Sequence, residues 1–289
     1  MESYERIIFK KDPPFAFITF NVPQRLNPLG VVMQKEIVGA IEDVDEDPSV
    51  RVVIIKGAGR CFSVGYDLED IDPGSTVAWQ VTDRKRDILE DRLRLWTISK
   101  RWLTIWDCKK TVIAQIHGLC LAGGTDIAFM CDLTIAAEDA KFGHPGVRGL
   151  GTPLSGPWTY YAGPMRAKML LLTGDTIDGK TAAEWGLISK AVPAEQLEDE
   201  VMRLAKRVAT VPNDLREINK LCSNRALEMM GLRDTIRDTC EINSISHFMP
   251  TVKEFWARVS SDGLKSALKW RDRSFEEIEE FSSYQKKSK

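Results

Sequence analysis

Apolar residues along this chain follow two patterns, which are short runs typical of buried strands and longer segments with helical spacing. The strand-like runs are rich in β-branched and aromatic residues, and glycine or proline interrupts the chain after several of them. Their alternation with helical segments predicts a parallel sheet with right-handed crossovers. The predicted strands are 15–21, 51–56, 112–116, 133–137 and 187–192, and the predicted helices are 31–44, 82–106, 164–173 and 180–186.

The pattern changes after residue 192, where the chain becomes helical and charged and no further strand is predicted. Pro212 marks the clearest break in this region. We therefore expect a core at 1–192 and a helical region at 193–289. Apolar stripes in the second part indicate a lid or an oligomerisation surface.

The helix expected at 82–106 carries several large apolar side chains. Two interpretations fit them: the wall of a substrate pocket, or a face packed on the core, which we favour. The stripe assigned to this face comprises Leu89, Leu93, Trp96 and Leu103, with Trp102 and Trp106 one turn apart.

The segment 111–132 combines a strand, a glycine turn and a helix. Gly123 and Gly124 precede the helix, so backbone N–H groups at its positive end could hold a negatively charged oxygen. Asp126 follows two residues later and could overhang the bound group. The alternatives are a tight turn and an ordinary first-turn acid of a helix.

Composition and charge exclude several classes of protein. The 289 residues carry a net charge of −2, which does not indicate nucleic acid or an anionic membrane as a partner. The N-terminus lacks the apolar segment of a signal peptide, and no stretch reaches the roughly 20 apolar residues of a membrane span. Six scattered cysteines without metal-site spacing predict a cytoplasmic protein that holds no metal.

Four stretches of the sequence resemble the crotonase (enoyl-CoA hydratase/isomerase) superfamily: NVPQRLNPLG, RVVIIKGAGRCFSVGYDLED, HGLCLAGGTDIAFMCDLTIAAEDAKFGHPGVRGLG and LLLTGDTIDGKTAAEWGLISKAVP. The resemblance implies an α/β fold, a crotonase-type spiral of ββα repeats with a C-terminal helical oligomerisation region that packs trimers or hexamers. It also implies an acyl-CoA thioester substrate, an enolate intermediate and no further cofactor.

The resemblance places the two oxyanion N–H donors at Tyr66 and Gly123. The two glutamates of the family's hydratases fall on Asp126, a shorter acid, and on Gly146, which has no side chain. A third acid used by some isomerases falls on Leu154. The two-glutamate hydratase mechanism is therefore incomplete in this chain.

Other residues could replace the missing acid. His144 lies two residues before Gly146 and is the candidate catalytic partner of Asp126. Arg148 could bind a substrate carboxylate or be solvated, and Tyr160 or Tyr161 could donate a proton or simply pack. A family branch with glycine at this position, dihydroxynaphthoyl-CoA synthase, uses bound bicarbonate instead.

The resemblance also implies a set of residues that bind CoA and substrate. Arg25 falls where the family places a basic residue near the CoA phosphates. The whole set is Arg25, Ser63, Val64, Gly65, Asp67, Leu68, Gly146 and Arg148. Asp67 has a second interpretation as a capping residue of the following turn.

We expect a lyase of the enoyl-CoA hydratase type in which Asp126 transfers the proton, helped by His144. A double-bond isomerase needs only Asp126 and is the second hypothesis. The third is a hydrolase or a retro-aldol or retro-Claisen lyase that cleaves a carbon–carbon bond. The fourth, from a different class, is an acyl-CoA-binding homologue without catalysis.

Overall fold

The computed structural model describes residues 4–70, 87–276 and 278. Its main sheet has the order β1-β2-β3-β4-β6-β9, in which only the β1–β2 pair is antiparallel. The strands are β1 (Ile7–Asp12), β2 (Phe15–Phe20), β3 (Val52–Gly57), β4 (Thr111–Ile116), β6 (Leu133–Ala137) and β9 (Lys190–Val192). The predicted parallel sheet is confirmed, and β1 is an additional strand at its edge.

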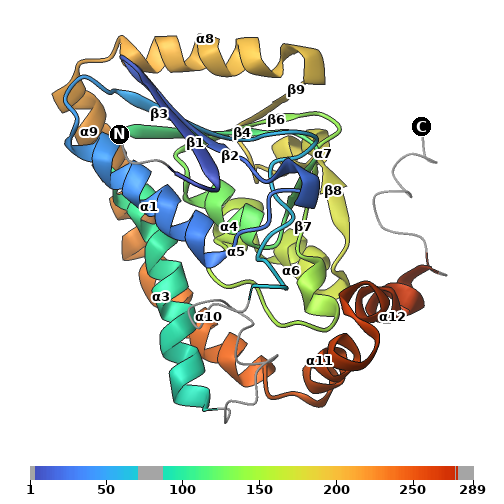
Figure 1. Ribbon diagram of the computed structural model, residues 1–289. Coiled ribbons are helices and arrows are strands. Elements are labelled where there is room, and N and C mark those ends of the chain that lie inside the picture. Colours follow the sequence, from blue (N-terminus) through green and yellow to red (C-terminus); the bar gives the residue numbers. More distant parts are fainter. Residues whose placement is uncertain (1–3, 71–86, 277, 279–289) are drawn as a thin grey trace.

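Helices cover both faces of this sheet. The central strands β3 and β4 are buried on both sides, as expected of apolar strands in a parallel sheet. α8 (Leu197–Ala209) lies across one face, and α1 (Val31–Glu46), α3 (Ile88–Asp107) and α4 (Gly123–Met130) lie on the other side (Figure 1). The main core is therefore continuous from the sheet into both helical layers.

A second, three-stranded sheet lies in segments that the sequence predicts as turn or loop. It consists of β5 (Leu119–Leu121), β7 (Lys141–Gly143) and β8 (Thr176–Asp178), with β7 in the middle. Each strand has three residues, which is too short for the alternation of polar and apolar positions that identifies a strand. This sheet fixes the start of two of the loops that form the site, those after β5 and β7.

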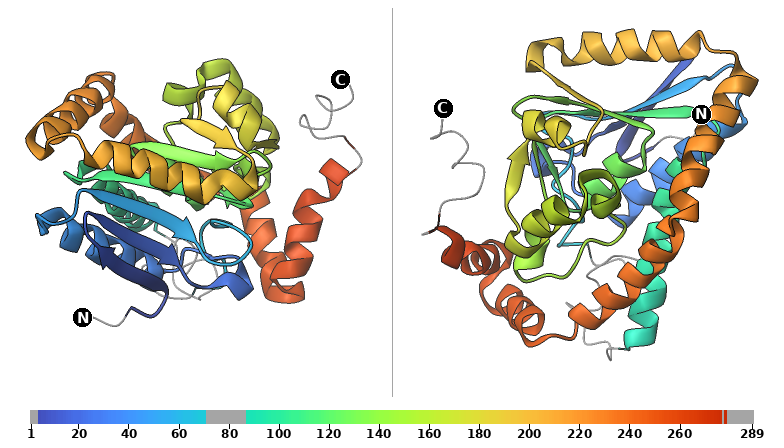
Figure 2. Two further views of the ribbon diagram at one scale, coloured as in Figure 1. Left: turned by 90° about the horizontal axis from the view of Figure 1, so that it is seen from above. Right: turned by 180° about the vertical axis from the view of Figure 1, so that it is seen from behind.

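The remaining helices complete the fold. α9 and α10 follow one another alongside α3, and α11 and α12 turn back towards α6 (Figure 2). Among the described helices, none combines the length and the apolar character that a membrane crossing requires. The bounds are α5 (Trp158–Ala162), α6 (Pro164–Thr173), α7 (Gly179–Glu184), α9 (Asn213–Met229), α10 (Leu232–Ser246), α11 (Pro250–Asp262) and α12 (Leu264–Glu276).

The last strand of the described chain ends at Val192, where the sequence pattern changes. The division into 1–192 and 193–289 remains a prediction. α8, which follows that boundary, packs on β3, β4 and β6 and so covers the core sheet.

The predicted stripe of the helix at 82–106 is wrong in part, because Leu89 and Leu93 are exposed. The buried face of α3 carries Leu95 and Ile98, together with three residues of the prediction: Trp102, Leu103 and Trp106. Both sets of residues repeat with a helical period, and the two faces differ by a rotation of about one residue around the helix axis. The sequence period therefore does not choose between the two faces, and tertiary packing decides which one is buried. Residues 82–86 of this predicted helix lie outside the described residues.

Candidate active site

A cavity of about 810 Å³ lies between the loops of the core and the C-terminal helices. One side comes from the loops after β3, β5 and β7, and the other comes from the end of α10 and from α11 and α12. A cleft of this size that combines apolar and polar walls is the usual form of a small-molecule site.

The turn from β5 into α4 is strained at Ala122, which has φ 48° and ψ −119°. A residue with a side chain at positive φ costs on the order of 1–3 kcal/mol, and such strain clusters at functional sites. The Ala122 N–H donates to the Gly143 carbonyl of β7, which fixes the turn against the small sheet. The turn thereby presents the N-terminus of α4 to the cavity.

Tyr66 and Gly123, the predicted oxyanion donors, lie against each other. A Cβ atom at Gly123 would lie 2.9 Å from the ring of Tyr66, so only glycine fits at this position. Within the described part of the chain, neither backbone N–H has an acceptor. Two unpaired N–H groups beside a cavity have the composition of an oxyanion hole.

A chain of hydrogen bonds connects the cavity wall to the buried acid. Trp102 Nε1 donates to the Tyr66 hydroxyl (2.9 Å), and that hydroxyl donates to Asp126 Oδ2 (2.8 Å). The Ser155 N–H lies 3.4 Å from Asp126 Oδ1, which is a long contact. Asp126 is fully buried behind the wall, and Tyr66, which lines the cavity, covers it.

Burial sets the ionisation of both groups. It raises the pKa of Asp126 to about 7, although the hydrogen bond from Tyr66 acts in the opposite direction. Burial and the neighbouring carboxylate raise the pKa of Tyr66 well above its usual value, so the phenol stays protonated. A carboxyl group that titrates near neutral pH is suited to accept and return a proton.

His144 occupies the space beside Gly146. A Cβ atom at position 146 would lie 2.9 Å from His144 Cε1 and 3.2 Å from its Nδ1, so the glycine makes room for the imidazole. Burial lowers the pKa of His144 to about 4, which keeps the ring neutral at pH 7. His144 and Gly146 both line the cavity, and Nδ1 is buried with no partner among the described residues.

The predicted CoA residues divide into wall and support. Arg25, Val64, Asp67 and Leu68 line the cavity, and Arg25 donates to both Asp67 oxygens at 2.8 Å. Ser63 and Gly65 do not belong to this wall.

The Ser63 hydroxyl instead supports the loop from behind. It donates to the Asn27 carbonyl and accepts from the Gly65 N–H. The structure thus brings together four of these six predicted residues at the cavity surface.

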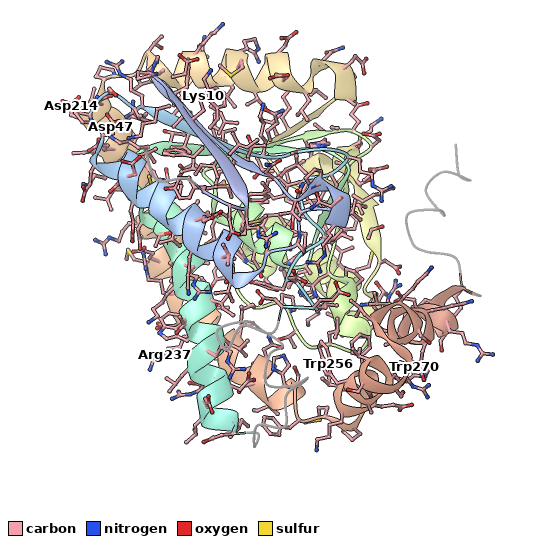
Figure 3. All side chains as sticks on the ribbon, in the orientation of Figure 1. Lys10, Asp47, Asp214, Arg237, Trp256 and Trp270 are labelled. Atoms are coloured by element: carbon pink, nitrogen blue, oxygen red, sulfur yellow. The ribbon has the colours of Figure 1, made fainter. Side chains whose placement is uncertain are left out.

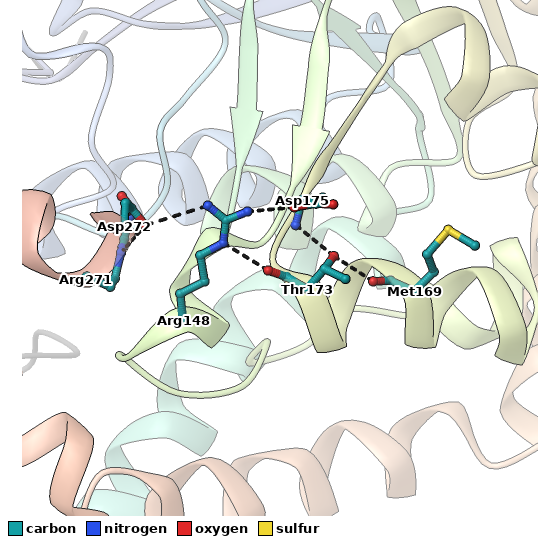
Figure 4. Close-up of polar contacts among 6 residues, drawn as sticks. All are labelled: Arg148, Met169, Thr173, Asp175, Arg271 and Asp272. Atoms are coloured by element: carbon teal, nitrogen blue, oxygen red, sulfur yellow. Dashed lines mark hydrogen bonds and ion pairs between the residues drawn. The ribbon is translucent and has the colours of Figure 1, made fainter. Parts of the chain in front are cut away.

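Arg148 lies away from the cavity wall. Its guanidinium donates to the Thr173 carbonyl (3.0 Å) and to Asp175 (2.8 Å), and it lies 3.8 Å from Asp272 of α12 (Figure 4). It also lies over the ring of Phe275. These contacts connect the loop after β7 to α6 and α12.

Tyr160 and Tyr161, the other candidate proton donors, also pack outside the cavity. Their hydroxyls donate to the carbonyls of Met230 and Phe129, respectively.

Sequence motifs miss one whole side of the cavity. Figure 3 shows Trp256 and Trp270 on α11 and α12, and Trp256 lines the cavity. The other missed residues on this side are Asn243, His247, Leu264, Lys265, Leu268 and Arg271. They come from three helices without a motif, so only the tertiary fold identifies them. No cluster suited to a metal ion occurs in the described ranges.

Known proteins are similar to this chain in sequence and in fold. The family described as Enoyl-CoA hydratase/isomerase matches residues 12–244. A crotonyl-CoA hydratase of Syntrophomonas wolfei is 33% identical over 231 residues, which cover 78% of this chain and 84% of that relative. The structure of an enoyl-CoA hydratase from Mycobacterium smegmatis has a TM-score of 0.87 and 32% identity, and covers 93% of this chain and 94% of its own.

A second structure, of an enoyl-CoA hydratase/isomerase from Xanthobacter autotrophicus Py2, has a TM-score of 0.85 and 32% identity over 94% of this chain and 99% of its own. These similarities confirm the expected crotonase-type fold and the expected enoyl-CoA hydratase- or isomerase-like class of enzyme. The chain belongs to the enoyl-CoA hydratase/isomerase family of the crotonase superfamily.

Proposed function

We propose that this protein is an enoyl-CoA hydratase-type lyase in which Tyr66 carries protons between the substrate and Asp126. The observation that supports this proposal is the hydrogen bond from the Tyr66 hydroxyl, in the cavity wall, to a buried carboxyl group with a pKa of about 7. The backbone N–H groups of Tyr66 and Gly123 hold the thioester oxygen as it becomes an enolate.

The proton moves in two coupled steps. In the elimination direction the Tyr66 oxygen accepts the proton from the α-carbon of the thioester, while its own proton passes to Asp126. The oxygen has a lone pair for this, because a hydroxyl accepts two hydrogen bonds and Trp102 fills one of these positions. Asp126 then returns the proton through Tyr66 to the β-hydroxyl, which leaves as water as the enolate collapses to the enoyl thioester. Addition of water follows the same path in reverse.

His144 is the group that positions this water. A neutral imidazole with a buried, unpaired Nδ1 can hold a water molecule by a hydrogen bond, but at a pKa of about 4 it is a weak base. Asp126 therefore carries the acid–base step, and His144 replaces the absent second carboxylate only in orienting the water.

A double-bond isomerase is the second candidate, and the glycine at position 146 favours it. Isomerisation returns the same proton to another carbon, so one relay is sufficient and no water needs activation. Carbon–carbon cleavage and binding without catalysis remain further alternatives, since neither needs a second acid.

The thioester itself serves as substrate, and we propose no further cofactor. Arg25, Lys265 and Arg271 place positive charge along the cavity, where CoA phosphates would bind. Arg25 is paired with Asp67, and Arg271 is paired with Asp272. The CoA phosphates would therefore compete with these carboxylates for the two arginines, or bind beside them.

We further propose that the chain assembles as a trimer or hexamer. α9 exposes Leu215, Ile218 and Leu221 at spacings of three residues, and α6 exposes Met165 and Leu172. Apolar side chains exposed along one helix face are typical of an interface. Light scattering coupled to gel filtration measures the assembly, and a monomer at micromolar concentration would contradict this proposal.

Exchange at the α-carbon of a saturated acyl-CoA in heavy water tests the chemistry. We expect exchange in the wild type and its loss in Asp126→Asn, with thioester binding retained. Panels of enoyl-CoA substrates then separate water addition from bond migration. Binding without exchange in the wild type would refute proton abstraction and favour the last two alternatives.

A further inference from the structure

A buried hydroxyl group beside Asp126 has no role in the proton path described above. Ser155 lies in the segment between β7 and α5, directly after Leu154 of the cavity wall, and is 1% exposed. Its Oγ atom is fully enclosed and has no hydrogen-bond partner among the described residues. Buried polar atoms without a partner are rare in folded proteins, so this hydroxyl calls for an explanation.

The two carboxyl oxygens of Asp126 are not equally bonded. Oδ2 accepts the short hydrogen bond from the Tyr66 hydroxyl (2.8 Å). Within the described part of the chain, Oδ1 has only the long 3.4 Å contact from the Ser155 N–H. An ionised carboxylate accepts hydrogen bonds on both of its oxygens, and a buried charge is costly without them. Oδ1 therefore lacks a good donor when Asp126 ionises.

The Ser155 side chain is placed to supply this donor. The backbone N–H of the same residue is already directed at Oδ1, and the side chain lies close enough to Asp126 to lower the pKa of its carboxyl group. A serine side chain can change between staggered χ1 rotamers without any movement of the backbone. Such a rotation can carry the Ser155 hydroxyl from its unpaired position to Oδ1.

We infer that Ser155 is a positioning residue of the proton relay, whose hydroxyl donates to Asp126 Oδ1 whenever the carboxyl group is ionised. This inference rests on the proposed function and deepens it. With Oδ1 held, the proton is accepted at Oδ2, which faces Tyr66, and so it returns by the hydrogen bond through which it arrived. Ser155 does not line the cavity, so it acts through Asp126 and not on the substrate.

The other titratable groups that act on Asp126 keep their charge state near neutral pH. They are Tyr66, Cys120 of β5 and Cys240 of α10, and burial raises the pKa of each of them, that of Cys240 to about 11. All three therefore stay neutral. α3 contributes the uncharged Trp102, which reaches Asp126 only through the Tyr66 hydroxyl. A change of ionisation near pH 7 therefore reports on Asp126 itself.

The variant Ser155→Ala removes only the hydroxyl oxygen and keeps the backbone N–H that contacts Oδ1. The assay is α-carbon deuterium exchange in butyryl-CoA, octanoyl-CoA or 3-phenylpropanoyl-CoA, whichever exchanges fastest in the wild type. Loss of a hydrogen bond to the ionised carboxylate should move the inflection of the exchange rate up by about one pH unit. The rate well below the inflection should then fall about tenfold, whereas the KM and the rate on the high-pH plateau should change little.

The matched control is Thr152→Val, because Thr152 carries another enclosed hydroxyl without a partner among the described residues, in the same segment. Thr152 lines the cavity, so this control is read from the pH of the inflection and not from the KM. Its inflection should stay near that of the wild type, at about 7. An unmoved inflection in Ser155→Ala, or an equal loss of rate at every pH, would overturn the inference.

Urea unfolding gives a second readout that needs no substrate. Folding raises the pKa of Asp126, so stability falls as the pH rises towards that pKa, and Ser155→Ala should extend the fall by about one pH unit. The two stability curves should run parallel well below pH 7 and separate above it, whereas a constant offset would indicate a purely structural role and overturn the inference. Thioester binding without exchange in the wild type would refute the proposed function, while the unfolding curves would still decide whether the Ser155 hydroxyl binds the carboxylate.

Discussion

Removal of the Tyr66 hydroxyl is the most direct perturbation of the proposed proton path. Tyr66→Phe keeps the ring that packs against Gly123 and leaves the backbone N–H in place. It removes only the oxygen that connects Trp102 to Asp126. We therefore expect thioester binding to persist while proton transfer is lost.

The size of the effect follows from the two hydrogen bonds. Each buried polar group left without its partner costs about 1–3 kcal/mol. Loss of the partner of both Trp102 Nε1 and Asp126 Oδ2 should therefore lower the free energy of unfolding by ~2–6 kcal/mol. Loss of a general acid–base group should lower the rate of α-carbon exchange about 10²- to 10⁴-fold.

The pH dependence gives a second, independent sign. Exchange needs the ionised form of Asp126, so the wild-type rate should rise with pH through about 7. The Tyr66 hydrogen bond lowers the pKa of Asp126, so its removal should move this inflection to higher pH.

The assay is deuterium exchange into a saturated acyl-CoA, followed by mass spectrometry from pH 5 to 9. Tyr161→Phe is the matched control, because it also removes one buried tyrosine hydroxyl bond, to the Phe129 carbonyl outside the cavity. Wild-type exchange rates in Tyr66→Phe would refute the relay and assign the proton transfer to Asp126 alone.

Three further predictions concern stability and space. Relative to Asp126→Asn, the wild type should lose stability as the pH rises from 3.8 to about 7, because folding raises the pKa of Asp126. Relative to His144→Gln, the wild type should lose stability as the pH falls from 6.5 to about 4, because folding lowers the pKa of His144. Urea unfolding between pH 4 and 8 measures both, and parallel curves would contradict the assigned pKa values. Gly146→Ala should displace the imidazole and lower hydratase activity, whereas His144→Ala/Gly146→Glu should recover part of it by providing a second carboxylate; equal kcat in wild type and Gly146→Ala would count against this packing. Arg148→Met should lower the free energy of unfolding by about 3–5 kcal/mol in urea unfolding, because it removes this buried partner of Asp175. The KM for the thioester, from steady-state kinetics, should not change. A raised KM with unchanged stability would instead assign Arg148 to substrate binding.

Much of the fold follows from local sequence because its strands are long apolar runs. β2, β4 and β6 begin or end within a residue or two of the predicted bounds. β4 and β6 are almost fully buried, which requires a continuous apolar segment, whereas β2 alternates half-buried and buried residues. The three-residue strands β5 and β7 are too short to show any period, so the sequence alone indicates loops there.

The site divides in the same way. Tyr66, Gly123 and Asp126 lie on motifs and come together in the structure as the sequence suggests. The sequence does not show that the Tyr66 phenol covers Asp126, because that depends on the side-chain rotamer of Tyr66. Nor does the sequence show that Arg148 forms an ion pair with Asp175, which is 27 residues away and is brought beside it by the tertiary fold.

The two walls of the cavity have different origins in the chain. The match to the family ends at residue 244, just before His247, Trp256 and Lys265, which line the far wall. The matched segment therefore contains Tyr66, Gly123 and Asp126, whereas the far wall of the cavity comes largely from residues that follow it. Substitutions after residue 244 could therefore reshape the far wall of the cavity without touching Tyr66, Gly123 or Asp126.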